Sequence, residues 1–140
     1  MKNVTEMSDI SNGYYVSAKR WLSDLEFFKI ETAFLIHLKR DYFFTRLADL
    51  GDPEKLETIG NKLVLLVDDI HQTVVQVHAQ LKQLELVAEN DIVENIKNLG
   101  ETNTILESLM TNLTNEYREV KKQLFLCIEV VVRETEFLAG

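Results

Sequence analysis

Apolar residues recur at alternating spacings of four and three through the last third of the chain. The apolar positions of this seam are Ile92, Ile96, Leu99, Leu106, Met110, Leu113, Tyr117, Val120, Leu124, Cys127, Val131 and Leu138. Only Asn103 and Glu134 interrupt the pattern. A repeat of this length is typical of one long helix that packs against other helices along a single stripe.

A second seam with the same spacing lies in the middle of the chain. Its positions are Leu56, Ile59, Leu63, Leu66, Ile70, Val74, Val77, Leu81, Leu84 and Ala88. Ahead of it, Gly51 suits a helix C-terminus, Asp52 suits a helix cap, and Pro53 suits a first helical position. These signals predict a tight turn between two antiparallel helices.

The seams and turns together predict an all-α fold, an antiparallel up-down-up bundle of three long helices with coiled-coil-like packing. Residues 1–13 are expected to be a short helix or frayed, since Asn12-Gly13 marks a break, and residues 14–140 to form one domain. The turn before the third helix is expected at Glu89-Asn90-Asp91, where Asp91 and Glu94 resemble a capping box. The predicted helices cover about 14–48, 53–88 and 91–138.

Gly100 leaves one alternative for the third helix. The capping pattern from Thr104 to Glu107 could start a fourth helix there, and Asn103 would then mark a loose turn rather than a polar residue that sets register. We favour a continuous helix because the heptad phase runs unbroken through Gly100. Such a helix would reach ~70 Å against ~53 Å for the others, so it must bend near Gly100 or pack its overhang against another copy.

The first predicted helix carries apolar residues on two sides. A broad stripe includes Trp21, Leu25, Phe28 and Leu35, and the opposite stripe consists of Phe27, Ile30, Phe34 and Leu38. One stripe is enough for a helix that covers a core, so the second predicts a subunit interface or a partner site. The alternative is that the N-terminus or the segment 91–99 covers it.

Composition narrows the classes of partner. The chain has 23 acidic and 15 basic residues and a net charge of -8, which argues against binding to nucleic acid or to an anionic membrane surface. Cys127 is the single cysteine and lies on the seam, so we expect a small buried side chain rather than a nucleophile. No secretory signal or membrane span is evident, and a cytoplasmic location is expected.

Two other functions remain open from the sequence. The run Asp68-Asp69-Ile70-His71 partly matches the Glu-x-x-His motif of ferritin-like bundles. In that alternative the metal ligands would be Asp68, His71, His78 and His37. A carrier of small apolar ligands would instead use a pocket lined by aromatic residues of the first helix. No nucleotide-binding, hydrolase or haem motif is present.

We therefore expect a non-catalytic helical-bundle protein without a cofactor. It would act by forming homo-oligomers, most simply a dimer, or by docking a helical partner. Phe27, Ile30, Phe34 and Leu38 are the expected interface residues.

Overall fold

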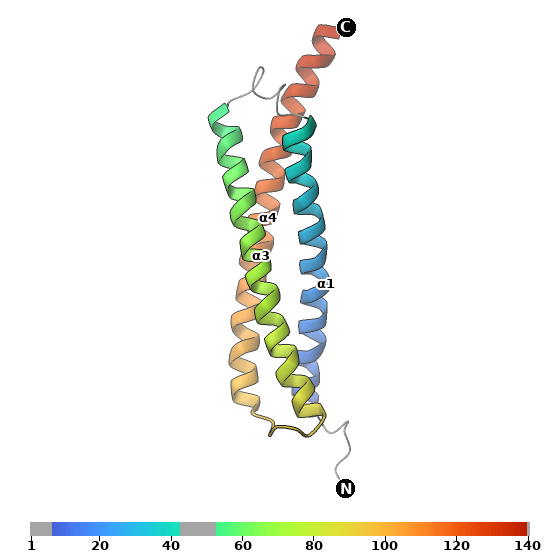
Figure 1. The fold of residues 1–140 in the computed structure, drawn as a ribbon, viewed down its shortest axis with the longest axis vertical. Helices are drawn as coiled ribbons and strands as arrows, with labels where there is room; N and C mark the ends of the chain where they lie inside the picture. The colour runs from blue at the N-terminus through green and yellow to red at the C-terminus, as the bar shows by residue number, and fades with distance from the viewer. Residues whose placement is uncertain (1–6, 43–52, 140) are drawn as a thin grey trace. The chain divides into compact units, whose positions relative to one another are not determined.

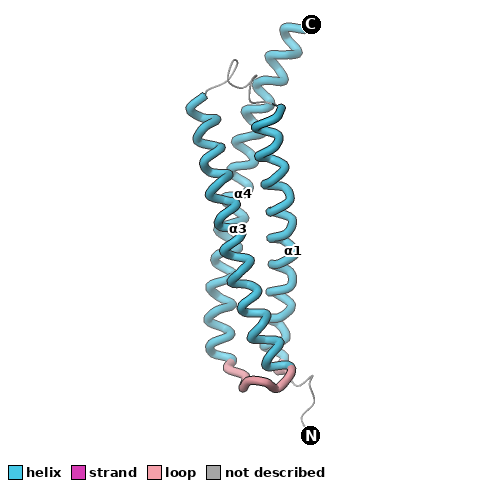
Figure 2. Tube along the Cα trace, in the orientation of Figure 1, coloured by secondary structure: helices cyan, strands magenta, loops and turns pink. Residues whose placement is uncertain are grey.

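The computed structural model describes residues 7–42 and 53–139 of the chain, with side chains described for residues 7–40, 53–130 and 133. Over this range the protein is all α-helical, and three long helices pack against each other in an up-down bundle without strands (Figure 1, Figure 2). They are α1 (Asp9–His37), α3 (Pro53–Ala88) and α4 (Ile96–Ala139), and a π-helical turn, η1 (Leu38–Tyr42), continues α1. The predicted fold class is confirmed.

The chain divides into two compact units, and each contains a stretch of all three long helices. The first unit is Met1–Phe27 with Ile70–Asn112, and the second is Phe28–Asp69 with Leu113–Gly140. The beginning of α1 thus shares a unit with the end of α3 and the beginning of α4. This arrangement requires α3 to run antiparallel to the other two helices. A single domain over residues 14–140 stays a prediction.

Helix α1 begins at Asp9, ahead of the predicted start at residue 14. Ser8 caps it, because the Ser8 Oγ accepts a hydrogen bond from the Ser11 N–H at 3.1 Å. The helix then continues through Gly13, which costs only about 1 kcal/mol relative to alanine. The predicted break at Asn12-Gly13 is therefore wrong, since the Ser8 cap and the burial of Ala18, Trp21 and Leu25 together offset the cost of one glycine.

Helix α4 is continuous from Ile96 through Gly100, so the alternative of a fourth helix is not realised. Its start differs from the predicted 91, because the cap is Asn95, whose Oδ1 accepts a hydrogen bond from the Asn98 N–H at 3.1 Å. Asp91 and Glu94 do not form the predicted capping box. Glu94 instead accepts a hydrogen bond from the Ser8 N–H at 3.1 Å, which ties the α3–α4 loop to the start of α1.

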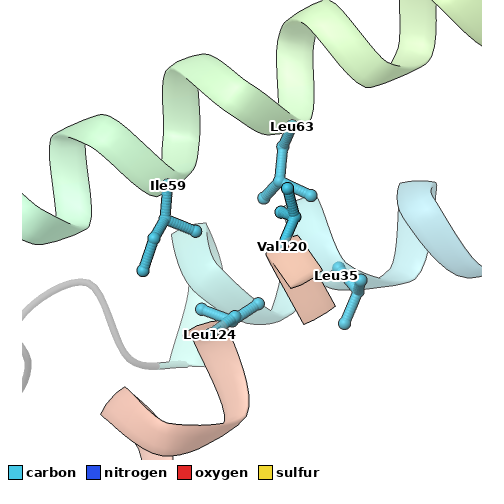
Figure 3. Close-up of a cluster of buried hydrophobic side chains, with 5 residues drawn as sticks. All are labelled: Leu35, Ile59, Leu63, Val120 and Leu124. Atoms are coloured by element: carbon cyan, nitrogen blue, oxygen red, sulfur yellow. The ribbon is translucent and has the colours of Figure 1, made fainter. Parts of the chain in front are cut away.

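Seam residues of α3 and α4, together with a residue from the broad stripe of α1, form the core of the second unit. Leu35 of α1, Ile59 and Leu63 of α3, and Val120 and Leu124 of α4 pack together and are at most 5% exposed (Figure 3). Cys127 packs against this cluster, but it is half-buried rather than fully buried as its seam position predicted. Burying a side chain of this size contributes about 1.5–3 kcal/mol to folding. The core therefore fixes which faces of α1 and α4 remain on the surface of this unit.

Some sequence predictions fall outside the described residues. These are the continuation of the first helix over residues 43–48 and the contribution of Gly51 and Asp52 to the first turn. Helix α3 begins at Pro53 and ends at Ala88, as the seam and the proline predicted. Of the helices described, none is long and apolar enough to cross a membrane.

Candidate interaction surface

Three of the four residues predicted to form an interface lie on the surface of α1. The side chains of Phe27, Ile30 and Phe34 are 56%, 62% and 58% exposed. On the other side of the helix, Leu35 is buried in the core of the second unit. Leu38 differs from the other three, because it is half-buried in η1 and packs against Leu56. The exposed stripe therefore ends before Leu38.

The stripe is exposed because α1 already buries its other side. Residues at spacings of three and four share one face of a helix, so Phe27, Ile30 and Phe34 lie one above another. The segment 91–99, which the sequence offered as a cover, forms the α3–α4 loop and the first residues of α4. More than half of each stripe side chain is exposed, so this segment does not cover the stripe.

In the second unit, a lysine of α4 connects the stripe to a further phenylalanine. Lys121 forms an ion pair with Glu31, which directly follows Ile30 in α1. The Lys121 Nζ also lies 5.5 Å from the centroid of the Phe125 ring, within the range of a cation–π contact. Phe125 is 44% exposed. We call Ile30, Phe34 and Phe125 the phenylalanine face of the second unit.

The polar groups beside this face are paired with one another. Burial acts to raise the pKa of Glu31, but the interactions with the Lys121 ammonium and the nearby Tyr117 hydroxyl, together with the positive charge of Lys121, outweigh burial and lower this pKa. Burial, together with the nearby Glu31 carboxylate, raises the pKa of Tyr117. At neutral pH the carboxylate is therefore charged and the phenol protonated. The Tyr117 ring also packs on Phe28, with centroids 4.6 Å apart, which anchors the group in the unit.

The residues of the metal-binding alternative do not form a cluster of ligands. Asp68, His71, His78 and His37 are all exposed, and the His37 Nδ1 lies 2.9 Å from a guanidinium nitrogen of Arg40. Across residues 7–42 and 53–139, no group of three or more histidine, cysteine, aspartate or glutamate side chains is placed to hold a metal ion. A metal site thus finds no support among the described residues.

A cavity of about 200 Å³ lies in the first unit, away from the aromatic residues that the carrier hypothesis invoked. Its lining comes from α3, the α3–α4 loop and the start of α4, and includes Gln80, Asn95 and Leu99. No residue of α1 lines it. The predicted pocket among aromatic residues of the first helix therefore does not correspond to this cavity.

Sequence reasoning missed Phe125 because the residue lies beside the α4 seam rather than on it. The available signal was local: Phe125 directly follows the seam residue Leu124 and lies one turn after Lys121. The relative register of α1 and α4 brings Lys121 to Glu31. The apolar spacing within each helix does not determine that register. No family model matches the sequence, and neither a curated protein nor a solved structure matches the chain.

Proposed function

We propose that this protein is a non-catalytic interaction module that self-associates through the phenylalanine face. The observation that supports it most is the exposure of Ile30, Phe34 and Phe125, at 62%, 58% and 44%, on two helices that the ion pair of Glu31 and Lys121 joins. Single exposed apolar residues are ordinary on protein surfaces, whereas clustered aromatic ones are typical of interfaces.

The charge balance of the face favours a second copy of the chain as its partner. The chain has a net charge of -8, so two copies repel each other over most of their surface. At the phenylalanine face, Lys121 neutralises Glu31, which leaves an apolar patch around a balanced pair. An isologous dimer places the same patch on both sides of its axis, and such a patch must not repel itself.

The free energy gained on self-association depends on how much of each side chain is still exposed in the single chain. Fully burying a phenylalanine contributes about 1.5–3 kcal/mol. Phe34 is 58% exposed in the single chain, so burial in an interface would add a little more than half of that, ~0.9–1.7 kcal/mol. An aspartate at position 34 would lose this gain and would also place an unpaired charge in the contact.

Sedimentation velocity of matched variants tests the proposal. Phe34→Asp removes one of the two phenylalanines of the face, and Val64→Asp is its control, because Val64 is 65% exposed on α3 in the same unit. We expect a wild-type oligomer that Phe34→Asp converts to a monomer with unchanged helical content, while Val64→Asp keeps the wild-type mass. An oligomer that survives Phe34→Asp, or that Val64→Asp disrupts equally, contradicts the proposal.

A further inference from the structure

The cavity of the first unit has an unusual lining of side-chain amides. Gln76, Gln80 and Gln83 of α3 face Asn95 and Asn98 at the start of α4. The volume of about 200 Å³ corresponds to roughly seven waters at about 30 Å³ each. It is therefore large enough for a compact ligand with a single ring, and it is open to solvent because most of its lining residues are exposed.

No charged side chain lines this cavity, although Asp, Glu, Lys and Arg make up 27% of the chain. The buried apolar lining is provided by Val87 and Leu99, which are 7% and 6% exposed, whereas Val93 in the loop is 91% exposed. A cavity without a charged side chain offers an ion no partner of opposite charge. It favours an uncharged ligand that has an apolar body and a polar end.

Two of the amides are held in place by hydrogen bonds within the first unit. Gln80 is 3% exposed, and its Nε2 donates to the backbone carbonyl of Leu99 at 2.9 Å. The Asn95 Oδ1 accepts from the Asn98 N–H at 3.1 Å. These bonds join α3 to α4 and fix the start of α4, so the cavity wall is ordered before any ligand arrives. Gln76 and Gln83 are exposed on the rim.

We propose that this cavity binds a small uncharged carboxamide attached to an apolar ring or chain. A carboxamide carries an N–H₂ donor beside a carbonyl acceptor, and the amide of Gln76 or Gln83 offers the matching acceptor and donor. The apolar body packs against Val87 and Leu99. A carboxylate of the same shape has no donor and a full charge, so it binds more weakly.

Benzamide and benzoate are the probes, because they have the same ring and differ at the polar end. Titration into the full-length protein labelled with nitrogen-15 follows the side-chain N–H₂ signals of glutamine and asparagine directly. We expect saturable shifts with benzamide, with a dissociation constant on the order of 1 mM, and much smaller shifts with benzoate. Gln76→Ala and Gln83→Ala each weaken benzamide binding by about threefold to tenfold, the loss of one hydrogen bond.

Gln72→Ala is the matched control, since Gln72 is an exposed glutamine on α3 that does not line the cavity. It keeps the wild-type affinity. The backbone amide spectrum of each variant shows whether the fold is intact, and substitution of the exposed rim residues leaves the buried Gln80 in place. The inference is overturned if benzamide gives no saturable shift, if benzoate binds equally well, or if the two rim variants bind as the control does.

Discussion

A pair of glycine-to-alanine substitutions tests how α1 packs against α4 in the first unit. Gly13 and Gly100 both lie inside long helices, so alanine relieves the same backbone cost of about 0.8–1.0 kcal/mol at each. Their surroundings differ. A methyl group at position 13 would meet no atom within 4 Å, whereas a methyl group at position 100 would lie 2.8 Å from the Tyr14 hydroxyl oxygen.

These distances give opposite expectations for the free energy of unfolding. Gly13→Ala should raise it by about 1 kcal/mol. Gly100→Ala adds the same helical gain but forces Tyr14 to move, and overpacking of this kind costs about 1–3 kcal/mol. The expected net effect of Gly100→Ala is thus between no change and a loss of about 2 kcal/mol.

A third substitution separates the contact from the helix effect. In Tyr14→Phe the hydroxyl is absent, and the nearest atom to the new methyl group would be the ring carbon Cζ at 3.6 Å, an ordinary contact. Gly100→Ala should therefore stabilise the Tyr14→Phe background by about 1 kcal/mol, as Gly13→Ala does in the wild type.

Urea unfolding followed by far-ultraviolet circular dichroism, at one fixed protein concentration, measures all of these variants. The reasoning is refuted if Gly100→Ala alone stabilises the protein as much as Gly13→Ala. It is also refuted if Tyr14→Phe leaves the effect of Gly100→Ala unchanged, because the hydroxyl would then not be the obstacle.

Two further substitutions test local electrostatics and capping. The pKa of Glu31 is lower in the folded chain than its ordinary value of 4.5, so its charge stabilises the fold at neutral pH, and this contribution is lost as the pH falls through the folded pKa. Glu31→Gln should lower the free energy of unfolding at neutral pH. It should also reduce the loss of that free energy on acidification, as measured by urea titrations at several pH values. An unchanged pH dependence would count against the ion pair with Lys121. Ser8→Ala leaves the Ser11 N–H without its acceptor and should cost about 1 kcal/mol in the same assay, whereas an effect below a few tenths would mean that the cap is not formed in solution.

The seams predicted the fold because they report directly on burial. Leu63 and Leu124 recur in phase with their helices, and both are at most 1% exposed. Phe34 lies out of phase with the core residues of α1, and it is exposed. Periodicity distinguishes these positions because packing depends on the side of the helix that a residue occupies.

Helix ends and contacts between helices were less predictable. Gly13 and Gly100 look alike in the sequence, yet one lies in open space and the other accommodates a tyrosine from another helix. The sequence of one helix gives the spacing of its apolar residues. It does not show which residue of α1 lies opposite Lys121. The ion pair with Glu31, and with it the place of Phe125 on the face, depends on that register.

The most direct test of self-association is the mass of the wild-type chain in solution, measured by size-exclusion chromatography with multi-angle light scattering over a range of protein concentrations. One chain has a mass of 16.2 kDa. Association through the phenylalanine face predicts a mass that rises with concentration toward an integral multiple of this value, or that stays at that multiple. A mass of one chain at every concentration would contradict self-association.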